Sequence, residues 1–178
     1  KSVLKELGGV IKNEDNIVLN YICTHNSRRS HLGQIWGQTI ADYYGILLTT
    51  YSGGTEETAL YPQIVDTLAN QGFEVFHISN KLNPIYGIRN SKKSPPMIGF
   101  SKMYDSSLNP KSGFTAIMTC SNADKLCPIV KGAKHRFSLT YEDPKISDGT
   151  EEQSEVYSER SKQIATEMKY LFEYFLGI

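Results

Sequence analysis

A cysteine stands between an apolar run and a short polar loop, and this arrangement limits the fold that the chain can adopt. The apolar run covers residues 16–22, and Cys23 opens the loop Cys-Thr-His-Asn-Ser-Arg-Arg-Ser. A short apolar run bounded by polar residues predicts a buried strand. Apolar residues recur at helical spacing over 30–44, so we expect a helix directly after the loop. A strand that enters a helix through a tight loop is typical of α/β folds, where ligands bind at the carboxyl ends of strands.

Strands and helices alternate along the rest of the chain. The further strands are expected over 46–52, 73–78, 114–120 and 137–141, and the further helices over 1–13, 62–71 and 151–176. This alternation predicts an α/β fold with a parallel sheet covered by helices on both faces. A length of 178 residues fits one domain, 1–178.

An insertion at about 79–113 interrupts the alternation and is rich in proline and glycine. Residues 85–88 and 97–104 have strand composition, and the polar stretch 90–94 between them is typical of a hairpin tip. We therefore expect an inserted β-hairpin. An insertion of this length is either functional or mobile.

The charge balance excludes some classes of partner. Lysine plus arginine and aspartate plus glutamate both number 19, so the net charge is zero. Nucleic-acid-binding domains usually carry a basic excess, so we expect no nucleic-acid partner. No apolar run has the length of a membrane span and the N-terminal residues lack a signal-peptide core, so we expect a cytoplasmic protein with no membrane association. We also expect a monomer.

The three cysteines, Cys23, Cys120 and Cys127, do not indicate a structural disulfide framework. They are either functional thiols or buried thiols without a chemical role. The histidines are scattered along the sequence, so no metal site is expected.

The loop after Cys23 has the residues that an oxyanion site requires. The amides of Thr24, His25, Asn26, Ser27, Arg28 and Arg29 can point at a bound tetrahedral oxyanion. Arg29 can bind that anion through two hydrogen bonds, and Ser30 can donate to the cysteine sulfur. Asn26 tolerates the left-handed conformation that a tight loop needs. The competing interpretation is a buried cysteine at a strand end, beside a surface arginine.

This loop resembles the phosphate-binding loop of the low-molecular-weight protein tyrosine phosphatases, with Cys, polar residues, Arg and Ser in order. The Asp143-Pro144 pair is similar to the Asp-Pro signature of that superfamily, whose aspartate is the general acid. The resemblance implies a three-layer α/β sandwich with a central, mostly parallel four-stranded sheet.

A narrower resemblance involves the other two cysteines. The segment 120–128, Cys-Ser-Asn-Ala-Asp-Lys-Leu-Cys-Pro, resembles the redox segment of thioredoxin-coupled arsenate reductases, which share the phosphatase fold. The stretch 52–56 resembles their Ser-Ala-Gly-Thr-Glu turn, in which the serine, here Ser52, supports the loop asparagine, here Asn26. Three residues depart from the family pattern, as does the insertion. They are His25 for glycine, Arg28 for cysteine or an apolar residue, and Gln34 for a glutamate that in some members helps hold potassium.

The resemblance implies reduction of arsenate to arsenite through a relay of Cys23, Cys120 and Cys127, with Arg29, Ser30 and Asp143 also catalytic. Reduced thioredoxin would supply the electrons, so no bound cofactor is expected. On an intact helix, two cysteines seven positions apart lie roughly 10 Å from each other, which exceeds the reach of a disulfide. The segment 120–131 must therefore be looped, or must partly unwind on oxidation.

Two other functions stay open at this point. A phosphatase would use Cys23, Arg29 and Asp143 to hydrolyse phosphomonoesters through a thiophosphate intermediate. A catalytically idle domain of the same fold would bind a phosphorylated partner. The presence of all three catalytic residue types argues against the idle domain.

Overall fold

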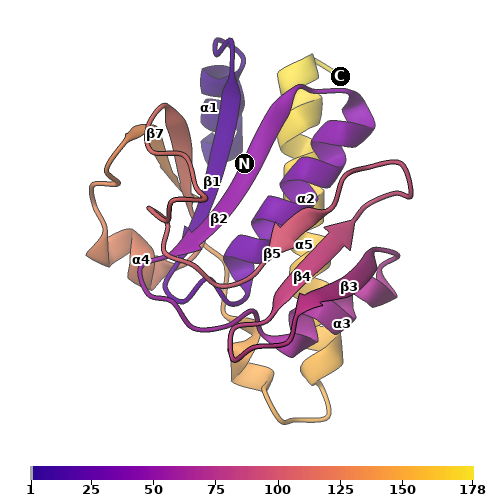
Figure 1. The fold of residues 1–178 in the computed structure, drawn as a ribbon. Coiled ribbons are helices and arrows are strands. Elements are labelled where there is room, and N and C mark those ends of the chain that lie inside the picture. The colour runs from indigo at the N-terminus through magenta and orange to yellow at the C-terminus, as the bar shows by residue number, and fades with distance from the viewer. Residues whose placement is uncertain (1) are drawn as a thin grey trace.

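The centre of the structure is a four-stranded parallel sheet with the order β2-β1-β6-β7 (Figure 1). The computed structural model describes residues 2–178. The strands are β1 (Ile17–Cys23), β2 (Leu48–Gly54), β6 (Phe114–Met118) and β7 (Ala133–Ser138), and each adjacent pair is parallel. The predicted fold class is confirmed. Because β1 lies between β2 and β6, Cys23 stands at the carboxyl end of an inner strand.

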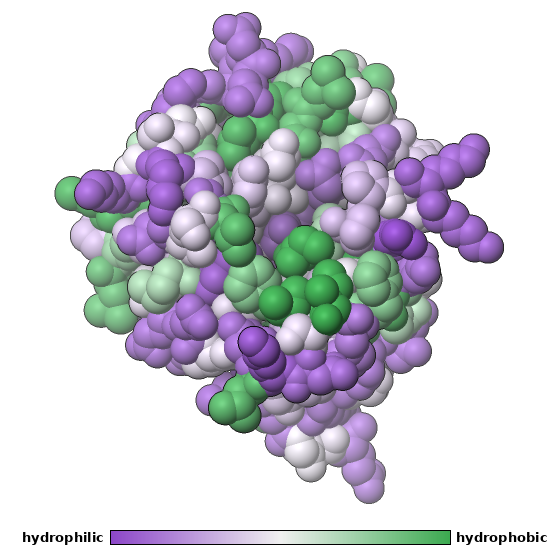
Figure 2. All heavy atoms as spheres, in the orientation of Figure 1, coloured by the Kyte–Doolittle hydropathy of each residue, from purple (hydrophilic) through white to green (hydrophobic). Residues whose placement is uncertain are grey.

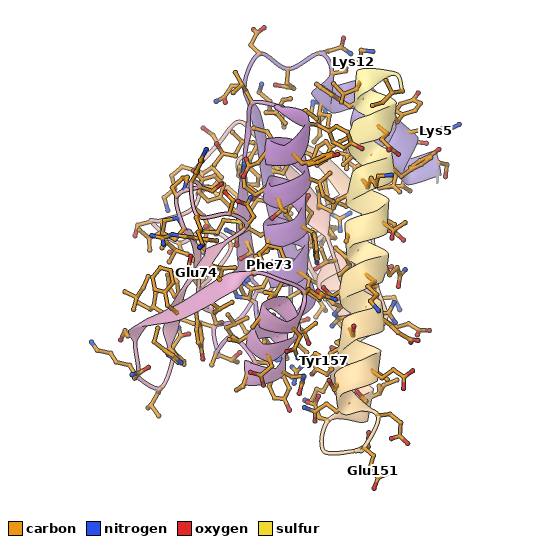
Figure 3. All side chains as sticks on the ribbon, turned by 90° about the vertical axis from the view of Figure 1, so that its right-hand side faces the viewer. Lys5, Lys12, Phe73, Glu74, Glu151 and Tyr157 are labelled. Carbon is orange, nitrogen blue, oxygen red and sulfur yellow. The ribbon has the colours of Figure 1, made fainter. Side chains whose placement is uncertain are left out.

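Helices cover both faces of this sheet unequally. On one face lie α1 (Ser2–Ile11), α2 (Arg29–Tyr44) and α5 (Gln153–Leu176), and Figure 3 shows α2 and α5 side by side. Their buried residues share one core cluster with β1. A smaller cluster on the other face includes Ala123 of the short helix α4 (Ser121–Leu126). None of the helices within residues 2–178 has the length and apolar character needed to cross a membrane.

The insertion builds most of a second sheet, with the order β3-β4-β5. β3 (Glu74–Ser79) pairs antiparallel with β4 (Ile85–Arg89), and β4 pairs antiparallel with β5 (Met97–Gly99), which confirms the hairpin. Its second strand is shorter than the predicted 97–104. After Gly99 the chain leaves the hairpin and runs to the end of β2, where Met103 forms a bridge with Gly54. The helix α3 (Pro62–Asn70) contacts β3 and α5.

One predicted strand is displaced along the sequence. The strand expected over 137–141 is β7, Ala133–Ser138, and the residues after it lead to a short 3-10 helix, η1 (Pro144–Ser147). β7 is an edge strand, half-buried over most of its length, and it contains Lys134, His135 and Arg136. Charged residues are common on edge strands. Because these residues are polar, a search for apolar runs does not detect the first part of the strand. The predicted strand therefore starts and ends too late in the sequence.

Two glycines in α2 leave room for a large side chain from β1. Tyr21 is fully buried, and its hydroxyl donates to the Met168 sulfur at 3.1 Å. A Cβ added at Gly33 would lie 2.4 Å from Tyr21 Cδ1, and one at Gly37 would lie 2.5 Å from Tyr21 Oη. The close approach of α2 to the sheet therefore depends on glycine at both positions.

We predict that Gly37→Ala lowers the free energy of unfolding by about 2 kcal/mol, because overpacking a filled core forces side chains to shift. In a Tyr21→Phe background the clashing oxygen is gone, so the cost is expected to be about 1 kcal/mol smaller. Urea unfolding of the four chains of this cycle measures the coupling.

Gly9→Ala is the matched control, since Gly9 is also helical and a Cβ there meets no atom of the described residues within 4 Å. It should raise stability by roughly 0.5–1 kcal/mol, the difference in helix propensity. Equal costs of Gly37→Ala in both Tyr21 backgrounds would contradict the proposed clash.

Candidate active site

Cys23 lies at the end of β1 and is buried, with 4% of its surface exposed. Its sulfur is 3.1 Å from the Ser30 hydroxyl, in the first turn of α2. The Asn26 amide donates to the same hydroxyl at 2.9 Å, which leaves the Ser30 proton available for the sulfur. The structure thus brings Cys23, Asn26 and Ser30 together as the sequence predicts.

The backbone carbonyls and the backbone amides of the loop differ in whether they have hydrogen-bond partners. Carbonyls of the loop accept bonds from surrounding segments: Thr24 from the Glu56 amide, His25 from the Ser101 and Thr58 hydroxyls, Ser27 from the Tyr61 amide and Arg28 from the Leu32 amide. Within residues 2–178, the amides of residues 24–29 donate to no protein acceptor. Unpaired donors gathered around a strand-to-helix turn are the arrangement that binds anions.

A small hollow lies in front of these amides, lined by Cys23, Thr24, His25, Ser27, Arg28, Arg29 and Asp143. The Arg29 guanidinium is fixed by two bonds, from Nη1 to the Tyr141 carbonyl at 2.8 Å and from Nη2 to Asp143 Oδ2 at 2.5 Å. Its Nε is buried without a partner in the part of the chain that the structure describes. This free donor supports the predicted role of Arg29 in holding an oxyanion. The structure also places Asp143 beside Arg29, 114 positions away in sequence.

The loop is held from behind by the insertion, which sequence reasoning did not foresee. Asn26 has φ +46°, the left-handed conformation expected of it, and its side chain is fully buried. The Lys102 amide donates to Asn26 Oδ1 at 3.0 Å, and the Ser101 hydroxyl donates to the His25 carbonyl at 2.8 Å. The part of the insertion that follows the hairpin therefore belongs to the scaffold of the loop.

Ser52, which the sequence predicts to support Asn26, makes no hydrogen bond to it within the described residues. The Ser52 hydroxyl bonds instead to Gln34 Oε1 at 2.6 Å and to His31 Nδ1 at 3.3 Å. Both partners are buried residues of α2, so Ser52 braces the helix that follows the loop rather than the loop itself. Burial, together with the nearby charge of Lys102, lowers the pKa of His31 to about 3, which keeps this histidine neutral.

Arg28 and His25 are the two loop residues that depart from the family pattern, and the side chains of both have partners outside the loop. Arg28 Nε donates to the Tyr157 hydroxyl and Nη2 pairs with Asp148, both at 2.6 Å, and the guanidinium lies 4.0 Å from the centre of the Tyr61 ring. His25 Nε2 lies 3.2 Å from Glu56 Oε2, and both side chains are about half-exposed. The Arg28 side chain thus ties the loop to α5, while its amide has no partner among residues 2–178.

Cys120 lies next to the loop, and Cys127 lies farther along the same segment. The Cys120 sulfur is 3.4 Å from the Thr24 hydroxyl, and its side chain is 1% exposed. Cys120 is the N-cap of α4 and accepts a bond from the Ala123 amide, while Cys127 follows the helix and is partly exposed. All three thiols are free. The sequence predicts that the segment 120–131 is either looped or unwinds partly on oxidation. Since a helix separates Cys120 from Cys127 here, a disulfide between them requires the second alternative.

An arginine on β7 fixes this helix. Arg136 Nη2 donates to the Asp124 carbonyl and carboxylate, at 2.7 and 2.6 Å, and Arg136 Nε donates to the Cys127 carbonyl at 3.2 Å. The Ser138 hydroxyl also donates to the Asp124 carboxylate. Sequence reasoning missed Arg136, although an arginine in a strand that follows the redox segment was a usable signal.

Comparison with known proteins finds curated arsenate reductases among the sequence relatives of this chain. Arsenate reductase 2 of Staphylococcus epidermidis is 27% identical over 131 residues, which are 73% of this chain and 80% of that protein. The arsenate reductase of Bacillus subtilis is 25% identical over 160 residues, 89% of this chain and 97% of that protein.

Among solved structures, a low-molecular-weight protein tyrosine phosphatase from Bacillus subtilis superposes with a TM-score of 0.60 at 12% identity. The match covers 90% of this chain and 98% of the phosphatase. No protein-family model matches the chain. The chain is similar in sequence to curated arsenate reductases and has the fold of the low-molecular-weight protein tyrosine phosphatases.

Proposed function

We propose that this protein reduces arsenate to arsenite, with Cys23 as the nucleophile. Cys120 and Cys127 return Cys23 to its thiolate form and end as a disulfide with each other. The observation that carries the proposal is the contact between Cys120 and Thr24, which sets a second thiol at the edge of the oxyanion loop. A phosphatase needs no second thiol at that place. The sequence similarity to curated arsenate reductases supports the same function.

In the first step, arsenate binds to the amides of residues 24–29 and to Arg29. The Cys23 thiolate attacks arsenic, a sulfur–arsenic bond forms, and a hydroxyl leaves as water with a proton from Asp143. In the free site Asp143 is paired with Arg29 at 2.5 Å. An oxyanion that binds the guanidinium competes for this pairing and leaves the carboxyl group to face the leaving oxygen.

The second step transfers two electrons to arsenic. The Cys120 thiolate attacks the Cys23 sulfur, the Cys23–Cys120 disulfide forms, and the electron pair of the sulfur–arsenic bond stays on arsenic, which leaves as arsenite. The Ala123 amide donates to the Cys120 sulfur at 3.4 Å and fixes its position beside the loop. Cys120 is therefore positioned as the resolving thiol.

In the third step, Cys127 attacks the Cys120 sulfur and releases the Cys23 thiolate. The helix α4 keeps the two thiols roughly 10 Å apart along its axis, so it must unwind before the disulfide can form. We propose reduced thioredoxin as the electron donor for this disulfide. Leu126 and Ile129, on either side of Cys127, are exposed apolar residues on which a reductant can dock.

The alternative is a phosphatase that uses Cys23, Arg29 and Asp143 and hydrolyses a thiophosphate intermediate with water. The fold and the Arg29–Asp143 pair favour this second candidate. The two functions differ in whether Cys120 and Cys127 are needed.

We predict that Cys23→Ser lowers arsenate-dependent NADPH oxidation, coupled through thioredoxin and its reductase, by at least about 10³-fold, because the nucleophile is lost. In single turnover without reductant, Cys127→Ser should release one arsenite per chain, whereas Cys120→Ser should release none. Multiple turnover that survives in either of these two variants would contradict the relay. If wild type hydrolyses p-nitrophenyl phosphate rapidly and does not turn over arsenate, the phosphatase is the correct function.

We predict that Asp143→Asn lowers kcat by about 10²-fold, the usual contribution of a general acid. Glu142→Gln is the matched control, because Glu142 is the neighbouring carboxylate and its side chain is 85% exposed. It should leave kcat unchanged. Steady-state kinetics of the two variants at several pH values makes the comparison, and equal effects would argue against Asp143 as the acid.

We predict that Arg136→Met makes the Cys120–Cys127 disulfide easier to form, since Arg136 stabilises the helical form that must unwind. The bonds are partly exposed, so the expected shift is about fivefold, or ~1 kcal/mol, towards the disulfide. Mass spectrometry in glutathione redox buffers, in a Cys23→Ser background, measures the equilibrium. Arg89→Met, which removes a surface pair with Glu74, is the control. A shift towards the dithiol would refute the role given to Arg136.

A further inference from the structure

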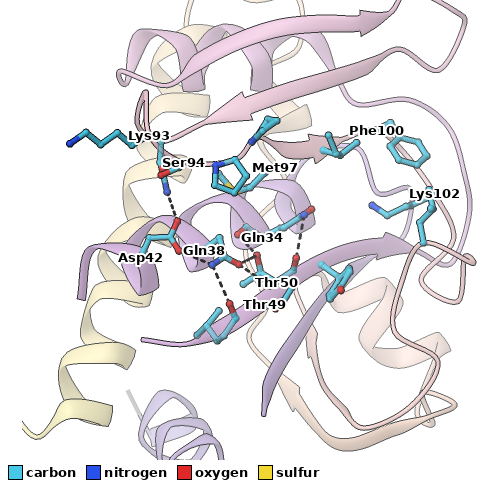
Figure 4. Close-up of a pocket in the computed structure, with 17 residues that line it drawn as sticks. Gln34, Gln38, Asp42, Thr49, Thr50, Lys93, Ser94, Met97, Phe100 and Lys102 are labelled. Atoms are coloured by element: carbon cyan, nitrogen blue, oxygen red, sulfur yellow. Dashed lines mark hydrogen bonds between the residues drawn. The ribbon is translucent and has the colours of Figure 1, made fainter. Parts of the chain in front are cut away.

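A cavity of about 680 Å³ lies away from the oxyanion loop, between α2, β2 and the inserted hairpin (Figure 4). Small-molecule sites usually measure about 300–1,000 Å³, so the cavity has a suitable size. Within residues 2–178, its lining shares no residue with the hollow around Cys23. It is thus a separate feature that the proposed reduction does not use.

The wall on the insertion side is mainly apolar. It includes Pro95, Pro96, Met97, Ile98 and Phe100, and Leu48 and Leu108 add apolar surface. Figure 2 shows a group of hydrophobic residues near the middle of the face where β4 and β5 lie in Figure 1. Ile98 is 41% exposed although it belongs to a strand. This apolar surface is available to a ligand with a hydrocarbon body.

One cation lies at the buried end of the cavity. Lys102 lines it and is 5% exposed, yet in the part of the chain that the structure describes its ammonium makes no hydrogen bond or ion pair. The Phe100 ring lies 5.0 Å from Nζ, and the neutral His31 is close enough to feel the charge of Lys102. Burial lowers the pKa of Lys102 to about 8, so the side chain remains mainly protonated at pH 7. A buried charge without a counter-charge is costly, and an anion in the cavity would offset that cost.

The other polar groups distinguish between possible anions. Asp42, at the mouth, is already bonded to Asn90 and Gln38. Gln34 Nε2 makes one long bond, 3.5 Å, to the Thr50 carbonyl and keeps donor capacity towards the cavity. One ammonium and one amide match a single carboxylate. A phosphate dianion would leave a charge uncompensated in apolar surroundings.

We propose that this cavity binds a small amphipathic monocarboxylate, with its carboxylate on Lys102 and its hydrocarbon body against Met97, Ile98 and Phe100. The ligand enters past the hairpin tip, where Lys93 and Ser94 line the mouth (Figure 4). The chemistry of the site, one cation at the end of an apolar wall, selects against both neutral alkanes and polyanions.

Decanoate and decanol are matched probes, because they share the hydrocarbon chain and differ in charge. Wild-type protein labelled with ¹³C in its methionine methyl groups is titrated with each. Decanoate should shift the Met97 signal saturably and leave the core residues Met118 and Met168 unchanged. Decanol should bind about tenfold more weakly or worse, since it lacks the ionic hydrogen bond.

Lys102→Met tests the cation, and Lys93→Met is the control lysine at the mouth. Lys102→Met should weaken decanoate binding by about tenfold or more and change decanol binding by less than about twofold, whereas Lys93→Met should do neither. If Lys102→Met does not fold, the comparison of decanoate with decanol in wild type decides the matter. Equal affinity for the two probes, or decanoate binding that survives Lys102→Met, or an unmoved Met97 signal would overturn the proposal.

Discussion

The oxyanion loop keeps its shape through the side chain of one buried asparagine. Asn26 lies in the left-handed region with φ +46°, and its amide bonds to Ser30 on one side and to the Lys102 main chain on the other. This places the loop between α2 and the insertion. The carbonyls of the loop are then used by neighbouring segments, and the amides are left for an anion. The orientation of Ser30 and the path of the insertion beside the loop both depend on this arrangement.

The sequence identifies the chemistry that lies within one continuous stretch. Cys23, Asn26, Arg29 and Ser30 lie within the eight residues 23–30, and the strand and helix on either side fix their relative positions. Asp143 could be assigned only through a family resemblance, because nothing local connects it to Arg29. The parallel sheet also follows from alternation of strands and helices. Here the local pattern and the global fold agree, as foldable sequences require.

Contacts between distant segments could not be predicted in the same way. Arg28 bonds to Asp148 and Tyr157, and Arg136 bonds to Asp124, through side chains whose proximity depends on the whole fold. The misplaced strand at 137–141 and the misassigned partner of Ser52 have the same cause. The bounds of an edge strand and the bonds of Ser52 to α2 both depend on segments that are distant in sequence. Lys102 is a further example. A lysine in a loop is usually exposed, and only the packing of the insertion shows that this one is buried.

The bonds from Arg28 to the C-terminal part of the chain have a consequence for how the protein is made. α5 packs against α1, α2 and α3, and it supplies Tyr157 as a partner for the oxyanion loop. A ribosome synthesises α5 after every other described element, so until it emerges, the parts of α1 and α2 that pack against α5 are uncovered. Assembly of the site during translation therefore waits for α5, and the incomplete chain exposes apolar surface to which chaperones bind during that interval.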